Sequence, residues 1–132
     1  MLGDVLKKLK RKKTADGAGQ AMQVLGAGSD LEEVMSEGLV VLFKHSNACP
    51  VSWAAHAQVT RFARENPGTT VYMIPVIKER SFSDKIAEIT GVEHESPQVI
   101  VLREGVVAAS ASHGDITVES LSEMLDAYPP AK

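Results

Sequence analysis

Five apolar stretches, separated by amphipathic segments, run along the chain and predict five strands. Residues 39–43 form a continuous apolar run, and residues 70–77 and 99–102 are similar runs rich in β-branched side chains. Short continuous runs of this kind are typical of strands buried on both faces. Residues 22–25 alternate and predict a short first strand, whereas residues 106–109 predict the last one. A three-residue turn ending in glycine separates the last two strands, which predicts an antiparallel hairpin.

The segments between the first strands carry apolar residues at helical spacing. The first predicted helix covers about residues 30–37, with Ser29 as N-cap and Glu32 completing a capping box. The second predicted helix begins at Pro50, because proline is favoured at the first helical position. The Asn-Pro-Gly sequence at residues 66–68 ends it.

Two further helices follow. Ser81 or Ser83 can cap a helix that ends at Gly91, and Thr117 caps a final helix that ends at Pro129. The predicted order is therefore (βα)βαβαββα. Because a β-α-β unit requires parallel strands joined by a right-handed crossover, we expect an α/β fold. Its central sheet is mixed, with four to five strands, and helices flank it.

Composition and charge predict one globular domain with a basic N-terminal arm. The chain has 132 residues, of which 44% are apolar and 23% charged, and its formal net charge is −3. Residues 1–13 hold six Lys or Arg against one Asp. We expect a basic arm and linker over residues 1–19 and the folded domain over residues 20–132. The domain is acidic and would repel phosphate backbones, so nucleic acid is not an expected partner.

Cysteine content and hydropathy exclude several protein classes. Cys49 is the single cysteine, which excludes an intramolecular disulfide and a zinc site built on several cysteines of one chain. The four histidines are scattered without ligand spacing, so no metal is expected. No apolar run approaches the ~18 residues of a membrane span, and residues 1–7 do not resemble a signal peptide. We therefore expect a protein of the reducing cytoplasm.

Cys49 stands between a predicted buried strand and the helix that Pro50 begins. The first backbone N–H groups of a helix have no intrahelical partner, and the macrodipole places partial positive charge there. Both effects favour a thiolate over a thiol. The sequence thus predicts a nucleophilic cysteine, although a buried structural cysteine is the alternative.

Ser52 occupies the position of the second cysteine in a Cys-x-x-Cys arrangement. In a dithiol enzyme that second sulfur attacks the mixed disulfide and releases the substrate. A serine cannot do so, and we expect its hydroxyl to donate to the Cys49 sulfur or to its own helical turn. Any exchange that Cys49 begins must be resolved by an external thiol.

The order of elements, the position of Cys49 and the Ser96-Pro97 pair before the third main strand resemble a thioredoxin fold. More narrowly, residues 22–127 resemble the monothiol bacilliredoxins, which are redox proteins of the bacillithiol system. The motifs that carry this resemblance are Leu42-Phe43-Lys44-His45-Ser46, Cys49-Pro50-Val51-Ser52, Thr90-Gly91-Val92-Glu93-His94-Glu95-Ser96-Pro97-Gln98-Val99 and Ala111-Ser112-His113.

This resemblance implies a reaction and its partners. Cys49 would attack a bacillithiol–protein mixed disulfide, release the reduced client protein and retain bacillithiol, which a second bacillithiol or another reductase then removes. Bacillithiol would be a co-substrate, S-bacillithiolated proteins the partners, and no cofactor would be tightly bound. Pro97 would be cis and face Cys49, and the Ser96 backbone would pair with the extended client or thiol ligand.

Four other side chains are candidate supporting residues. Lys44 and His45 end a strand at the rim where α/β folds bind ligands, so a cation there can stabilise the thiolate or pair with bacillithiol carboxylates. The alternative is a pair of loop residues facing water. Trp53 can pack beside the thiol, under a client chain or in the core. His94 can line the site or make a local hydrogen bond.

Two other functions stay open at this point. The first is a binding module that keeps the fold without redox activity. The second is an iron–sulfur or metal carrier of the monothiol glutaredoxin type, in which two chains bridge a cluster. That family has a Cys-Gly-Phe-Ser pattern, which this chain lacks.

Overall fold

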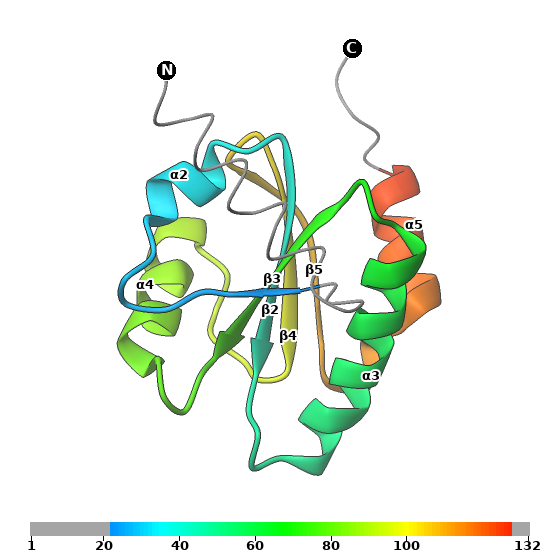
Figure 1. Ribbon diagram of the computed structural model, residues 1–132, viewed down its shortest axis with the longest axis horizontal. Coiled ribbons are helices and arrows are strands. Elements are labelled where there is room, and N and C mark those ends of the chain that lie inside the picture. Colours follow the sequence, from blue (N-terminus) through cyan, green and yellow to red (C-terminus); the bar gives the residue numbers. More distant parts are fainter. Residues whose placement is uncertain (1–21, 128–132) are drawn as a thin grey trace.

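The computed structural model describes residues 22–127, so the predicted basic arm lies outside the described residues. Figure 1 shows the arrangement of its elements. No helix within residues 22–127 is long and apolar enough to cross a lipid bilayer. In chain order the elements are β1 (Gln23–Val24), α2 (Leu31–Met35), β2 (Leu39–His45), α3 (Pro50–Glu65), β3 (Thr70–Pro75), α4 (Arg80–Thr90), β4 (Gln98–Arg103), β5 (Val106–Ser112), a 3₁₀ turn (His113–Asp115) and α5 (Val118–Ala127).

The five strands form one mixed sheet in the order β1-β3-β2-β4-β5. β1 and β2 run parallel to β3, whereas β4 is antiparallel to both β2 and β5. Helices α2 and α4 lie on one face of the sheet, and α3 and α5 lie on the other (Figure 1). The predicted α/β architecture is confirmed. Because β2 and β3 are parallel, their carboxyl ends meet at one edge, where the loops to α3 and α4 begin.

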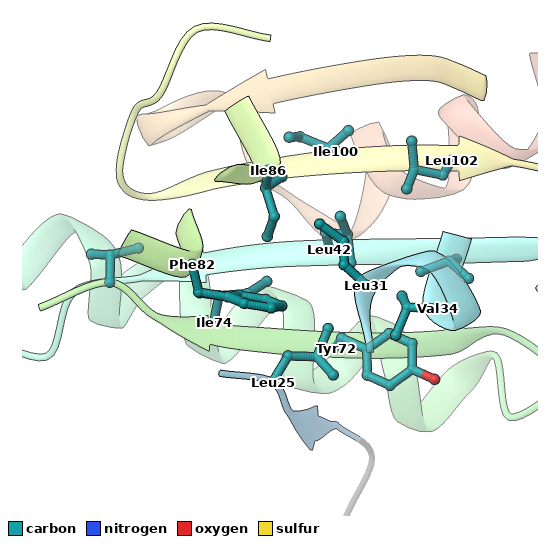
Figure 2. Packing of buried hydrophobic residues seen from close by; sticks show 12 residues of the cluster. Leu25, Leu31, Val34, Leu42, Tyr72, Ile74, Phe82, Ile86, Ile100 and Leu102 are labelled. Atoms are coloured by element: carbon teal, nitrogen blue, oxygen red, sulfur yellow. The ribbon is translucent and has the colours of Figure 1, made fainter. Parts of the chain in front are cut away.

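The side chains of β2 alternate between the two faces, as the pleat of a strand requires. Leu42 packs in the cluster beneath α2 and α4, which Figure 2 shows, and Phe43 packs against α3 and α5. The alternation continues at the end of the strand. Lys44 reaches α4 through a hydrogen bond to Ser83, and His45 contacts α3. Two neighbouring polar residues are therefore buried on opposite sides of the sheet.

Helix α2 begins one residue later than predicted. Its N-cap is Asp30, whose Oδ1 accepts a hydrogen bond from the Glu33 N–H at 3.2 Å. The Ser29 hydroxyl instead accepts from the Gly26 N–H at 3.1 Å. The prediction of Ser29 as N-cap was wrong because this side chain closes the turn that follows β1.

Helix α4 begins before both serines that were predicted to cap it. Glu79 is the N-cap residue, so Ser81 and Ser83 lie inside the helix, and Ser83 is fully buried. The Glu79 carboxylate accepts a hydrogen bond from the Ala27 N–H at 2.9 Å. This long-range contact holds the start of α4 against the loop after β1, which local sequence does not reveal.

Other local predictions are confirmed. Gly91 ends α4 in the left-handed conformation with φ 76°, which glycine adopts without strain. The predicted β4–β5 hairpin is confirmed, but its turn has two residues rather than three, because Arg103 still pairs with Val106. The turn has φ 49° at Glu104 and φ 81° at Gly105, the signs of a type I′ hairpin turn. Thr117 and Ser120 cap the start of α5 reciprocally, each hydroxyl accepting from the other residue's N–H at 3.0 Å.

The ends of all five strands differ from the predicted ones, and β5 and β3 show why. β5 continues to Ser112 rather than residue 109, because it pairs with β4 as far as Gln98. β3 ends at Pro75 rather than Ile77, since proline has no N–H to continue the ladder. The Val76 N–H still donates to the β2 carbonyl of residue 45 at 2.9 Å, which holds the two strand ends together.

Candidate active site

Cys49 is the N-cap residue of α3, in the position that the sequence predicts. Its backbone is extended, with φ −116° and ψ 121°, and Pro50 is the first helical residue. The Cys49 N–H donates to the Ser46 carbonyl and its carbonyl accepts from the Trp53 N–H, both at 3.2 Å. The cysteine is partly exposed rather than buried. A solute can therefore reach a residue whose backbone is held at both ends.

The first turn of α3 points unpaired amide hydrogens toward the thiol end of the helix. The first backbone N–H groups of any α-helix lack intrahelical acceptors. Pro50 has no N–H group, so the unpaired N–H groups at the start of α3 are those of Val51 and Ser52. The α3 macrodipole adds partial positive charge at the same end. Cys49 therefore lies at the positive end of α3.

A hollow of about 330 Å³, here called the thiol hollow, opens beside Cys49. Ser96 lies in its wall, and the Ser96–Pro97 peptide bond is cis. The predicted cis proline is therefore confirmed, and its loop faces the thiol across the hollow. The lining residues are Ser46, Cys49, Val76, Ile77, Arg80, His94 and Ser96.

Ser52 is fully buried and holds the loop that carries Cys49. Its Oγ accepts a hydrogen bond from the Ser46 N–H at 2.8 Å and lies 3.2 Å from His45 Nδ1. Burial, the largest cause, lowers the pKa of His45, so Nδ1 of the neutral ring can accept the hydroxyl hydrogen. The expected bond to the Cys49 sulfur or to the helix's own turn was wrong: Ser52 links α3 to the end of β2.

Trp53 lies on the surface over a small aromatic cluster. Its ring meets His45 edge-on with centroids 4.6 Å apart, and the His56 ring lies 5.2 Å away. The indole N–H donates to the Asn47 carbonyl at 2.9 Å, and half of the side chain is exposed. Core packing of Trp53 is excluded. The indole is bonded to the loop before Cys49 and does not line the thiol hollow, and a position under a client chain stays a prediction.

A second hollow, of about 270 Å³, adjoins this cluster on the α3 side of the sheet edge. Burial lowers the pKa of both His45 and His56, so the rings that line it are neutral at physiological pH. Ile77 lines both hollows and stands between them. The other lining residues are Asn47, Trp53, Met73, Pro75 and Lys78.

Lys44 does not line the thiol hollow but lies buried beneath it. Its Nζ donates to the Ser83 carbonyl at 3.0 Å and contacts His94 Nδ1 at 3.3 Å. Burial lowers the pKa of Lys44 to about 8. The expectation of a cation at the rim is thus not met by Lys44, whereas His94 does line the hollow as predicted.

Arg80, which was not predicted from the sequence, supplies the positive side chain at the thiol hollow. Its Nε donates to Asp84 Oδ1 at 2.9 Å, and this hydrogen bond is the main cause that lowers the pKa of Asp84. Val76 and Ile77 were missed as well. All three follow β3, and the parallel pairing of β2 with β3 places the loops after both strands at one edge. The predicted β-α-β unit already implied that the loops after these two parallel strands lie side by side.

The cis-proline loop is supported from the far side by the end of β5. The His113 N–H donates to the Pro97 carbonyl at 3.0 Å, while the His113 side chain is exposed.

Within residues 22–127, no cluster of three or more His, Cys, Asp or Glu side chains could hold a metal ion.

Comparison with known proteins shows the fold and the family. The chain matches monothiol bacilliredoxin BrxC over residues 23–121. A solved structure described as ‘a putative oxidoreductase with a thioredoxin fold’ is 35% identical, with a TM-score of 0.74, covering 79% of this chain and 93% of that one. A point mutant of thioredoxin from Halobacterium salinarum is 16% identical (TM-score 0.66, 84% and 93% covered), and thioredoxin from Trypanosoma brucei brucei is 15% identical (TM-score 0.69, 85% and 94% covered). The thioredoxin fold is therefore shown, and the chain belongs to the monothiol bacilliredoxin family.

Proposed function

We propose that this protein reduces mixed disulfides between bacillithiol and client proteins by thiol–disulfide exchange at Cys49. The observation that carries the proposal is the thiol hollow, in which a partly exposed cysteine at a helix N-terminus faces a cis-proline loop. Family membership supports bacillithiol as the small thiol. The chain has no second cysteine, so the reaction needs an external thiol to complete it.

The reaction has two displacement steps. The Cys49 thiolate attacks the bacillithiol sulfur of the mixed disulfide, a new disulfide forms between them, and the client thiolate departs with the electron pair and is protonated. A second bacillithiol then attacks the same bacillithiol sulfur. Bacillithiol disulfide leaves, and Cys49 returns to its thiolate form. The client thiol is restored, the second bacillithiol is the reductant, and the two bacillithiol molecules leave joined in one disulfide.

The walls of the thiol hollow support binding of both parts of such a substrate. Ser96 lines the hollow, where its backbone would pair with an extended ligand, and Val76 with Ile77 forms an apolar wall. Arg80 is the cation that would attract the carboxylates of bacillithiol. Ser52 and His45 take no part in the exchange itself and keep the Cys49 loop in place. We place this activity in the cytoplasm, where a lone reactive thiol stays reduced.

Mass spectrometry of the intact protein tests the proposal. After incubation with bacillithiol disulfide, the wild-type chain should gain one bacillithiol, and peptide mapping should place it on Cys49. The Cys49→Ser variant should gain none. The wild-type protein should also restore the free thiol of an S-bacillithiolated client. A Cys49 that stays unmodified, or that alkylates slowly at neutral pH, would refute the proposal and favour a binding module.

An Arg80→Gln variant tests the part of the hollow that recognises the small thiol. We expect its reaction with bacillithiol disulfide to slow several-fold while its reaction with an uncharged alkyl disulfide changes little, because only the former presents carboxylates. Arg61→Gln is a matched control, since Arg61 is exposed on α3 and pairs with Glu65 away from the hollow. Equal slowing on both disulfides would show that Arg80 does not recognise the ligand.

A further inference from the structure

A buried lysine amine touches a histidine in the wall of the thiol hollow, and the exchange as described does not use this contact. Lys44 Nζ lies 3.3 Å from His94 Nδ1 and donates to the Ser83 carbonyl at 3.0 Å. The lysine side chain is fully buried, whereas His94 is partly exposed in the hollow that Cys49 also lines. Burying an ammonium group costs free energy of folding, so a buried lysine beneath Cys49 is a candidate functional group.

The contact determines which ring nitrogen of His94 carries the proton. An ammonium group can only donate hydrogen bonds, so His94 Nδ1 is the acceptor of this one. Ser83 Oγ, 3.1 Å from the same nitrogen, is compatible with this arrangement because a hydroxyl can also donate. The neutral imidazole therefore holds its proton on Nε2, the nitrogen opposite the Lys44 contact.

The charges around the ring favour this neutral form. Burial is the main cause that lowers the pKa of His94, and Lys44 and Arg80 add to it. Asp84 and Glu95 act in the opposite direction without reversing the shift. These groups come from β2, α4 and the loop before the cis proline, which are the elements around His94.

We propose that Lys44 and His94 form a proton relay that protonates the client thiolate as it leaves. The proposal rests on the proposed function. In the first step His94 Nε2 gives its proton to the departing sulfur while Nδ1 takes one from the Lys44 ammonium. Lys44 becomes a neutral amine and His94 changes tautomer. In the second step the attacking thiol gives its proton to Nε2, the Nδ1 proton returns to Lys44, and the starting state is restored.

The acidity of Lys44 suits this role. Burial lowers its pKa to about 8, which is close to the ~8.5 of an ordinary thiol. Proton transfer between groups of similar pKa is nearly balanced, so one relay can serve as acid in the first step and as base in the second. An exposed lysine would hold its proton too strongly to give it up to a thiolate.

Substrates with different leaving groups test the relay. An alkyl thiolate, as in a bacillithiol–client disulfide, needs a proton when it leaves, whereas the thiolate released from dithiobis-nitrobenzoate is already stable at neutral pH. For Lys44→Met and His94→Gln we expect about a tenfold to hundredfold loss of single-turnover rate on the alkyl substrate. The loss on the aryl disulfide should be at least tenfold smaller. His113→Gln, an exposed histidine outside the hollow, is the matched control.

An independent measurement uses the wild-type protein alone. Long-range ¹⁵N–¹H correlation of the imidazole rings should show His94 as the Nε2–H tautomer, and Lys44→Met should weaken that preference. A dominant Nδ1–H tautomer in the wild type would overturn the relay. So would equal losses on alkyl and aryl disulfides, or no loss on either. A wild-type protein inactive on the bacillithiol substrate would refute the proposed function instead, and hydroxyethyl disulfide would then serve as the alkyl substrate for the relay.

Discussion

Replacing Lys44 by methionine should change how the stability of the protein depends on pH. The amine is fully buried and its two hydrogen-bonding contacts are to the Ser83 carbonyl and His94 Nδ1. Burial lowers its pKa from 10.5 to about 8. Methionine keeps the length and the apolar stem of the side chain but cannot bind a proton, so the variant lacks this titration.

The size of the effect follows from the two pKa values. Each unit corresponds to about 1.4 kcal/mol, so the charged amine costs the native state about 3 kcal/mol at most. The cost is fully present below pH 8 and disappears as the pH rises to 10.5, because in that window the unfolded chain holds a proton that the native chain has lost. The wild type should therefore gain about 3 kcal/mol relative to Lys44→Met across this window.

Urea unfolding at a series of pH values measures this difference. Trp53 is the single tryptophan, so its fluorescence reports unfolding in both proteins. Lys85→Met, which removes an exposed lysine on α4, is the control and should run parallel to the wild type at every pH. A constant difference between Lys44→Met and the wild type would refute the argument, and the relay would then have no proton source near neutral pH.

Three further substitutions test the local framework of the site and the fold. Ser52→Ala should lower the free energy of unfolding by about 2 kcal/mol, since Ser46 N–H and His45 Nδ1 lose their partner, and a urea midpoint equal to the wild type would contradict this. Gly105→Ala forces a side chain into a backbone with φ 81° and should cost about 1 kcal/mol, visible as a lower Tm, whereas an unchanged Tm would argue against a strained turn. Thr117→Ala should cost about 1 kcal/mol through loss of the α5 cap, and Thr117→Ser should recover most of it; equal losses would show that the hydroxyl is not the cause.

The sequence by itself determined the features that depend on neighbouring residues. The buried run of β2, the proline that begins α3 directly after Cys49, the glycine that ends α4 and the hairpin turn all follow from local backbone preferences. The order of these elements also sufficed for the fold class, because short parallel crossovers allow few topologies. The proposed nucleophile was readable for the same reason, since one cysteine at a helix start needs no distant partner to be recognised.

Only the tertiary structure decided what each polar side chain of the site touches. The pleat of β2 sends Lys44 toward α4 and His45 toward α3, and the partners they meet there lie far along the chain. Arg80 enters the thiol hollow because parallel pairing brings the ends of β2 and β3 to one edge. Ser52 is turned from the sulfur to the loop by the same packing. Backbone preference is local, but a buried polar group must find its partner among whatever elements pack against it, so its role is determined only when the sheet and helices are assembled.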